Sequence, residues 1–216
     1  MTLLRLDASI RTEGSYRRRL ADVVEREWLS AHPGAEVTRR DLGVDPIPST
    51  AWPLAVGAMG RVADELTDAE RDAVGLATRL TDELVGADSL LLAVPLYNWG
   101  VSQHVKAWVD LVMTDPRAGT GPAMALAGRS AVLVTVRGGG YSPGTPRHGW
   151  DHATDWMRRI LADVWQLDLD LVETELTLAE HRPYLAQFVD LSRQLHAKAE
   201  IEAARLGGLL GGRRAG

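Results

Sequence analysis

Residues 88–100 read DSLLLAVPLYNWG, an apolar run that stops abruptly in proline, a polar pair and an aromatic residue. The run from Asp88 to Val94 is typical of a buried strand, and the segment from Ser102 to Met113 has the spacing of a helix. Open α/β folds bind ligands at the carboxyl ends of their strands. The hexapeptide Pro95 to Gly100 therefore predicts a ligand-binding loop, although Pro, Tyr and Asn also end strands as ordinary turn residues.

A second segment, Leu3 to Tyr16, reads as a short strand, a hydroxyl-rich turn and the start of a helix. The backbone amides around Ser15 to Arg17 would be the unpaired donors of a helix N-terminus, which favour a phosphate. The hydroxyls of Ser9 and Ser15 would be additional ligands. Neither the dinucleotide fingerprint nor the P-loop pattern occurs in the chain, so a monophosphate fits better than a dinucleotide or ATP.

This turn also has a simpler interpretation, because serine is a common helix cap and Ser9 and Ser15 could serve only that purpose. The run Arg17-Arg18-Arg19 is equally typical of a solvated helix face. Of these arginines, Arg17 is nearest the turn and is the candidate phosphate contact.

A third segment, Ser130 to Ser142, is an apolar, β-branched strand that ends in Arg137, Gly138, Gly139 and Gly140. Glycines can turn tightly and let backbone amides approach a flat ligand. An ordinary glycine-rich turn would look the same. Three strand ends of this kind on one sheet edge favour a ligand site.

Composition narrows the class of protein. The chain has 216 residues, of which 45% are hydrophobic and 25% charged, with a formal net charge of −5 and no cysteine. The acidic balance argues against a nucleic-acid partner, and no apolar run has the length of a membrane span. No signal-peptide pattern is present, so we expect a cytoplasmic protein. Disulfides and thiolate metal sites are excluded.

Strand-like and helix-like segments alternate along the chain, which predicts a parallel sheet covered by helices on both faces. We expect a single domain over residues 1–206 and a disordered, glycine-rich tail over 207–216. The expected strands lie near 2–8, 35–42, 88–94, 129–136 and 167–174. The first expected helix begins at Ser15, and the others run over 67–86, 102–113, 153–164 and 183–206.

Taken together, these motifs resemble those of the FMN-dependent NAD(P)H azoreductases, which are also quinone reductases. The resemblance runs from Leu3 to about Leu195 and rests on the three segments above, on Asp41-Leu42 with Pro46-Ile47-Pro48, and on Val105 to Asp110. It implies a flavodoxin-like α/β fold, a doubly wound three-layer sandwich with strand order 2-1-3-4-5. It also implies a homodimer with the active site at the subunit interface.

The resemblance further implies one FMN per subunit and NADH or NADPH as co-substrate. The phosphate would lie against Ser9, Ser15, Tyr16 and Arg17. The ring and ribityl chain would lie against Pro95, Leu96, Tyr97, Asn98 and Trp99, and the pyrimidine side against Arg137, Gly138, Gly139 and Gly140. Electrons would pass in a ping-pong cycle to a small aromatic acceptor such as a quinone or azo compound, with the chemistry carried by the flavin. Tyr141 would donate a proton or line the pocket, and we favour lining.

Two departures from the family bear on this interpretation. Trp99 stands where many members have Phe, and Val136 stands where a hydroxyl is frequent. The second departure leaves open a relative that has lost flavin and has a binding role, and a flavodoxin-like electron carrier to a protein partner is a further alternative. His148 and His152 are four residues apart, but surface histidines are the expectation there, and we predict no metal site.

Overall fold

The computed structural model describes residues 1–10, 15–119 and 125–212. In this part of the chain, parallel strands form a sheet in the order β2-β1-β3-β5-β6. Their bounds are β1 Thr2–Asp7, β2 Glu36–Asp41, β3 Ser89–Tyr97, β5 Ser130–Val136 and β6 Asp168–Thr174. The order is 2-1-3-4-5 for the main strands, and the predicted fold class is confirmed.

The central strands are the most apolar segments of the sequence. Every residue of β5 is buried, and β3 is buried from Ser89 to Pro95. In register, Leu92 lies between Leu6 of β1 and Leu133 of β5. A strand that is covered on both faces cannot alternate polar and apolar residues, which explains the continuous runs that marked these strands in the sequence.

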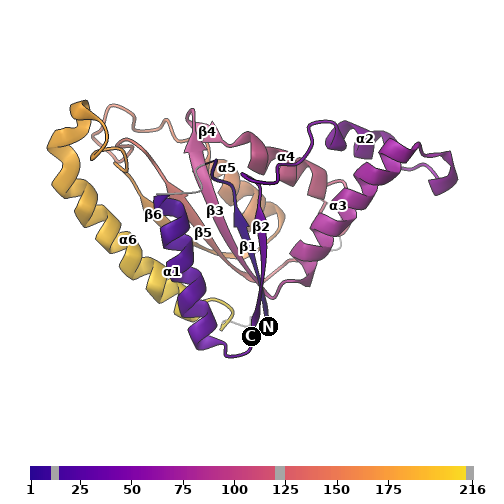
Figure 1. Ribbon diagram of the computed structural model, residues 1–216, viewed down its shortest axis with the longest axis horizontal. Coiled ribbons are helices and arrows are strands. Elements are labelled where there is room, and N and C mark those ends of the chain that lie inside the picture. The colour runs from indigo at the N-terminus through magenta and orange to yellow at the C-terminus, as the bar shows by residue number, and fades with distance from the viewer. Residues whose placement is uncertain (11–14, 120–124, 213–216) are drawn as a thin grey trace.

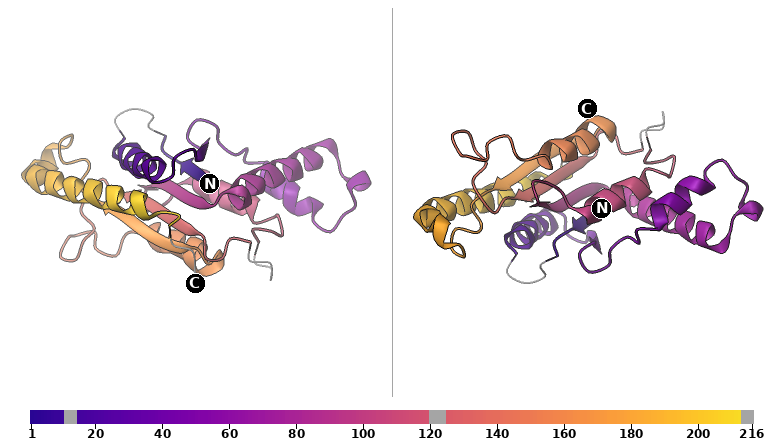
Figure 2. Two further views of the ribbon diagram at one scale, coloured as in Figure 1. Left: turned by 90° about the horizontal axis from the view of Figure 1, so that it is seen from below. Right: turned by 90° about the horizontal axis from the view of Figure 1, so that it is seen from above.

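Helices cover both faces of this sheet (Figures 1 and 2). One layer holds α1 Tyr16–Ala31 and α6 Val189–Leu209, which pack together and on the sheet. The other holds α3 Asp68–Gly86, α4 Gln103–Val112 and α5 Thr154–Arg158. Thr67 and Glu70 form the predicted capping box of α3, and Ser102 caps α4 by accepting from the amide of Val105.

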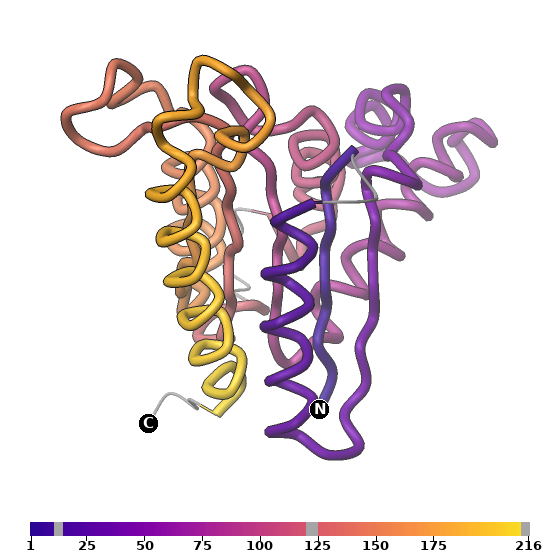
Figure 3. The backbone as a smooth tube through the Cα atoms, turned by 60° about the vertical axis from the view of Figure 1, so that its left-hand side comes forward, coloured from indigo at the N-terminus to yellow at the C-terminus, as the bar shows by residue number. Residues whose placement is uncertain are grey.

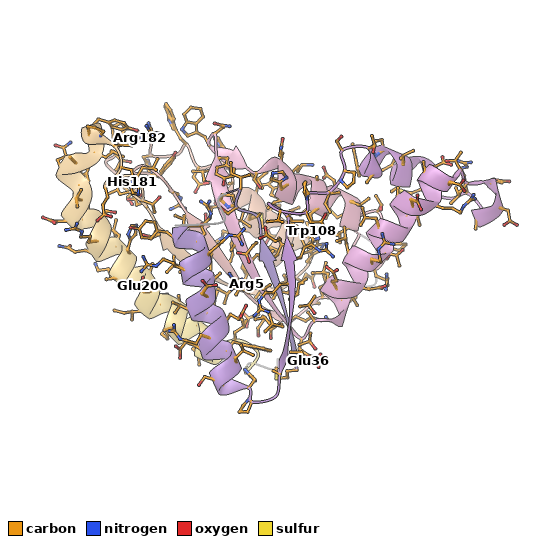
Figure 4. All side chains as sticks on the ribbon, in the orientation of Figure 1. Arg5, Glu36, Trp108, His181, Arg182 and Glu200 are labelled. Carbon is orange, nitrogen blue, oxygen red and sulfur yellow. The ribbon has the colours of Figure 1, made fainter. Side chains whose placement is uncertain are left out.

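Each layer has a tryptophan at its centre. Trp28 of α1 is fully buried against the first face, and Trp108 of α4 is buried against the second, where Figure 4 labels it beside the sheet. Trp108 meets Trp165 edge to face at 5.7 Å between ring centroids, and the indole N–H of Trp165 donates to the carbonyl of Ala118 at 2.9 Å. These tryptophans therefore stabilise the core and leave the sheet edge to other residues.

The structure adds elements that the sequence did not predict. The strand β4, Gly100–Val101, pairs antiparallel with the end of β3. A short helix, α2 Ala51–Ala58, and a 3₁₀ turn, η1 Ala63–Glu65, occupy the proline-rich segment. The expected helix over 153–164 is divided into α5 and a π-helical turn, η2 Arg159–Val164.

The C-terminal helix also differs from its expected bounds. A 3₁₀ turn, η3 Pro183–Phe188, precedes α6, which continues to Leu209 rather than ending at Leu206. Gly207 and Leu210 are buried, because this end of α6 packs on α1. The first residues of the expected tail are thus part of the packed structure, while residues 213–216 lie outside the described part.

The loops that follow the carboxyl ends of the strands gather at one end of the molecule, and the N-terminus and the last turns of α6 lie at the other (Figure 3). This is the edge where ligands bind in open α/β sheets. Among the described residues, none of the helices has the length and hydropathy needed to cross a membrane.

Candidate functional site

The turn after β1 and the end of β3 meet at this edge. Nη2 of Arg17 donates to the hydroxyl of Ser9 at 2.8 Å and to the hydroxyl of Tyr97 at 3.2 Å. The Tyr97 hydroxyl also accepts from the amide of Ile10 at 3.3 Å. Three residues that the sequence placed on two different ligand loops are therefore in direct contact, as a common site requires.

Ser15 occupies the N-cap position of α1, but it does not act as a cap. Its hydroxyl makes no capping bond, and it is buried with no hydrogen-bond partner among the described residues. A buried hydroxyl without a partner is unfavourable by itself and marks a place where a polar ligand would fit. It points to the phosphate interpretation of this serine, since a capping serine would bond to an amide of the first turn.

A shallow pocket joins this helix start to the end of the fourth main strand. Its walls include Ser15, Tyr16, Arg17 and Val136, with Leu178 beyond β6. The side chain of Tyr16 turns toward α6 and stacks on His196 at 4.1 Å between ring centroids. Tyr16 therefore contributes its backbone, at the first position of the helix, more directly than its ring.

The base of the turn is a network of charges. Arg18 pairs with Asp41 at 2.7 Å and donates to the carbonyl of Ser9 at 3.3 Å. Arg5 is buried and pairs with Asp7 at 2.8 Å. Burial lowers the pKa of Arg5, but the charges and hydrogen bonds of Asp7 and Asp22 outweigh it and raise that pKa, so the guanidinium stays charged. The negative charge of Asp7, which would repel a phosphate, is thus offset by the positive charge of Arg5.

The backbone of Ser9 is also held from the side by Gly43. A Cβ atom at Gly43 would overlap the carbonyl oxygen and carbon of Ser9. Only glycine allows the loop after β2 to lie this close to the turn after β1. Spacing alone gave no signal for Gly43, because its partner is distant in sequence.

The clamp segment after β3 forms a two-residue hairpin. Tyr97 pairs with Gly100, and the turn residues Asn98 and Trp99 have φ of 47° and 63°. Positive φ at both positions is the geometry of a type I′ turn, in which asparagine is favoured and tryptophan is strained. Pro95 and Leu96 remain in β3, with Pro95 beside Val136, whereas Asn98 and Trp99 are exposed.

The loop after β5 presents backbone amides at the same edge. The amides of Gly138, Gly139 and Gly140 make no hydrogen bond to another described residue. The amides of Tyr141 and Ser142, in contrast, both donate to the buried carboxylate of Glu175, at 2.6 and 3.1 Å. Glu175 thus fixes the far end of the loop and leaves the glycine amides available to a ligand.

The glycines themselves have a packing reason. A Cβ at Gly138 would lie 2.8 Å from Leu178, and one at Gly139 would lie 2.8 Å from the guanidinium of Arg147. Both contacts are with the ends of flexible side chains, which would have to move aside for a Cβ atom. What the loop offers to a ligand is therefore its unpaired backbone amides, and not empty space left by missing side chains.

The side chain of Arg137 is engaged by acidic groups. Its guanidinium forms ion pairs with Asp151 and Glu173 and donates to the hydroxyl of Thr154. Burial lowers the pKa of Arg137, but Glu173 and Asp151 outweigh it and raise that pKa. Arg137 holds the loop over 137–153. Its backbone is engaged as well, since its amide donates to the carbonyl of Thr174 and its carbonyl accepts from Thr177, so in this structure Arg137 supports the loop. The Tyr141 side chain is half buried in the same loop.

Several residues of the site carried no usable signal in the sequence. Arg18, Gly43 and Glu175 act through partners from other loops, and Trp150 stands beside Trp99 from the loop after β5. The predicted set from the three strand ends is otherwise brought to one edge of the sheet. In the part of the chain that the structure describes, no cluster of His, Asp and Glu is arranged to hold a metal ion.

The donor set fits a flavin mononucleotide. An orphaned buried hydroxyl, a helix N-terminus and an arginine suit a monophosphate. Aromatic residues at the hairpin and unpaired amides at the glycine loop suit a flat ring with polar edges. The two loops lie at the ends of neighbouring strands, β3 and β5, so one ligand can contact both.

Comparison with known proteins identifies the family of this chain. A family profile described as flavodoxin-like fold matches residues 1–175. A protein of Frankia casuarinae named FMN-dependent NADH:quinone oxidoreductase is 38% identical over 206 residues, which cover 94% of this chain and 97% of that protein. The chain therefore belongs to the flavodoxin-like family.

Solved structures agree on the fold. An azoreductase from Bacillus anthracis strain Sterne superposes with a TM-score of 0.75 at 20% identity, covering 96% of this chain and 99% of that one. An FMN-dependent NADH-azoreductase from Bacillus anthracis strain Ames Ancestor, in complex with FMN, superposes with a TM-score of 0.72 at 16% identity, covering 95% and 99%. At such identities the likeness is one of fold.

Proposed function

We propose that this chain is an FMN-dependent NADH:quinone oxidoreductase that also reduces azo compounds. The observation that carries the proposal is the meeting of Ser9, Arg17 and Tyr97 beside the orphaned hydroxyl of Ser15. Relatives named FMN-dependent NADH:quinone oxidoreductase, which align with nearly the whole chain, support it.

The phosphate of FMN would be held at the start of α1. The hydroxyl of Ser15, the first amides of the helix and the guanidinium of Arg17 are its donors, and Ser9 supports Arg17. The positive end of the helix dipole adds to this attraction. Arg5 and Arg18 keep the neighbouring carboxylates neutralised, so a dianionic phosphate meets no uncompensated negative charge.

The ring would be held between the hairpin and the glycine loop. Tyr97, Asn98 and Trp99 provide one wall and an amide edge, while Pro95 and Leu96 provide the apolar base. The amides of Gly138 to Gly140 would lie against the polar edge of the ring and would donate to the negatively charged form of the reduced flavin. Tyr141 lines this side.

When bound, FMN supplies the hydride acceptor and donor of the reaction. The chain would orient the co-substrate and the acceptor against the same face of the flavin ring. The oxidised co-substrate would therefore leave before the acceptor binds. The reaction would need no protein nucleophile. Exposed aromatic surface at Trp99 suits flat acceptors such as quinones and azo compounds. A cytoplasmic location goes with the use of NADH.

We also infer that two copies of the chain associate through the α2 region. Trp52, Val56, Met59 and Val62 are 43–62% exposed, and Figure 1 shows α2 projecting beyond the sheet. Exposed apolar residues gathered on α2 and on the turn that follows it mark an interaction surface. Light scattering of the purified protein should give a dimer mass, and Val56→Glu should give a monomer. A monomeric wild-type protein would contradict this assignment.

The proposed function is tested with purified protein under anaerobic conditions. We expect a flavin visible spectrum, bleaching on addition of NADH, and recovery of the oxidised spectrum on addition of a quinone. A protein that neither contains nor takes up FMN would overturn the proposal. A flavin that is reduced only by a partner reductase, and not by NADH, would identify an electron carrier instead.

A further inference from the structure

Two exposed tryptophans meet beside the hairpin. Trp99 and Trp150 are 44% and 48% exposed, and their rings lie edge to face with centroids 5.8 Å apart and planes at 77°. One comes from the turn between β3 and β4, and the other from the loop after β5. Aromatic residues that pair in this way at the surface, instead of entering the core, present two apolar faces nearly at right angles, so a flat ligand stacked on one ring can touch the other with its edge.

Trp99 is held in place by its backbone. Its φ of 63° is a backbone angle that residues other than glycine and asparagine rarely adopt. The pairing of Tyr97 with Gly100 maintains the turn, and the amide of His152 donates to the carbonyl of Trp99 at 2.9 Å. Strain of this kind persists where the surroundings impose it, and it is found at functional sites.

Trp150 is placed by the residue that follows it. The carboxylate of Asp151 accepts from the amide of Thr154 at 2.9 Å and from its hydroxyl at 2.7 Å. The same carboxylate pairs with Arg137, which follows β5 directly and pairs in turn with Glu173 of β6. The position of Trp150 is thus tied to two strands of the sheet.

The geometry points to a specificity role. We propose that Trp150, together with Trp99, forms the platform for the electron acceptor and selects fused-ring aromatic acceptors over single-ring ones. Arg137 is a positioning residue that acts on this platform through Asp151. The inference rests on the proposed function and extends it, because an indole set nearly at right angles to Trp99 can contact the far edge of a fused-ring ligand that a single-ring ligand does not reach.

The test compares two quinones on FMN-loaded protein. In Trp150→Ala, the KM for naphthoquinone should rise about 10-fold, the equivalent of a lost aromatic contact, while the KM for benzoquinone should change less than about 2-fold. Because nicotinamide is a single ring, the rate at which NADH bleaches the flavin should change no more than the KM for benzoquinone. Ile201→Ala, which shortens an exposed apolar side chain on α6, is the control and should alter neither KM.

A second readout does not depend on flavin. Two indoles in this geometry give an exciton couplet in far-ultraviolet circular dichroism, so Trp150→Phe and Trp99→Phe should remove the same spectral component, and the double variant should remove no more. The buried pair of Trp108 and Trp165 remains as an internal reference. Arg137→Gln should weaken the couplet and raise the naphthoquinone KM, and Arg137→Lys should restore part of both.

The outcomes separate the two proposals. A flavin-loaded Trp150→Ala or Trp150→Phe protein that loses the couplet but keeps the wild-type ratio of KM values would overturn the specificity role alone. Single variants with unrelated difference spectra would overturn the pairing. A wild-type protein that NADH does not reduce would instead overturn the proposed function.

Discussion

Nη2 of Arg17 lies 3.2 Å from the hydroxyl of Tyr97, and this contact joins the first turn of α1 to the end of β3. The guanidinium carbon also lies 5.5 Å from the centre of the Tyr97 ring. The turn after β1 and the hairpin after β3 are therefore parts of one hydrogen-bonded unit. A substitution of Arg17 should therefore affect both the turn and the hairpin.

Arg17→Ala is expected to weaken FMN binding by roughly 10- to 100-fold, the loss of a charge-assisted hydrogen bond to phosphate. Riboflavin, which lacks the phosphate, should bind Arg17→Ala nearly as well as it binds the wild-type protein. Titration calorimetry of the apoprotein with each ligand measures the difference.

Arg19→Ala is the matched control for this experiment. Arg19 lies two residues further along the same helix, is 62% exposed and pairs with Glu200 of α6. Its loss should leave FMN affinity unchanged. Equal weakening of FMN and riboflavin by Arg17→Ala would show that Arg17 supports the fold of the turn rather than the phosphate.

Gly43→Ala should damage the turn without touching any ligand. The added methyl group would overlap the Ser9 backbone, so the turn must shift, at a cost of about 1–3 kcal/mol in the free energy of unfolding. FMN affinity should fall as well. Gly86→Ala, at the end of α3 where a Cβ meets nothing within 4 Å, should be neutral or stabilising by up to about 1 kcal/mol. Urea unfolding of both variants gives the comparison, and a fully stable Gly43→Ala protein would contradict it.

The sequence predicted the sheet because its signals are local. Apolar runs at β3 and β5, a capping box at Thr67 and helical spacing after Ser15 each lie within a few residues, and each element formed where it was expected. The short helix α2 was missed, since Pro53 and the neighbouring glycines are typical of loops. Proline is nevertheless tolerated in the first turn of a helix, where its missing amide has no partner to lose.

Only the part of the site that lies at the ends of strands was predicted from the sequence. Residues at a strand end or just beyond it, such as Tyr97 and Ser9, are placed by the sheet itself. Arg137 also follows a strand, but its side chain is taken by Asp151 and Glu173, which arrive from later segments. Contacts between distant loops, including those of Gly43 and Glu175, depend on tertiary packing that spacing does not encode.

Asn98 can be tested with two substitutions that separate its side chain from its backbone. Asn98→Gly keeps the positive φ of 47° without strain and removes the amide group, so the hairpin should retain its stability while FMN binds more weakly. Asn98→Ala removes the same amide and also strains the turn by about 1–2 kcal/mol. FMN titration and thermal unfolding of both variants separate the two effects. Wild-type FMN affinity in Asn98→Gly would show that the side chain does not contact the flavin.

Asp151 should make stability depend on pH in the acid range. Burial raises the pKa of this carboxyl and is the largest single effect, but hydrogen bonds from Thr154 and the charge of Arg137 together outweigh it and lower the pKa below its usual value. A carboxyl whose folded-state pKa is lowered stabilises the protein above its unfolded pKa of about 4, and the contribution is lost as pH falls below that value.

Asp151→Asn should therefore cost about 1–3 kcal/mol at neutral pH, the range for a buried hydrogen-bonded group. The difference from wild type should shrink as the pH is lowered from about 4. Urea unfolding followed across this range measures it, with Asp163→Asn, an exposed carboxyl paired with Arg159, changing stability by less than about 0.5 kcal/mol at neutral pH. A difference between Asp151→Asn and wild type that stays constant down to the lowest pH would mean that Asp151 holds its loop through packing, and that its ionised form is not what joins Trp150 to the sheet.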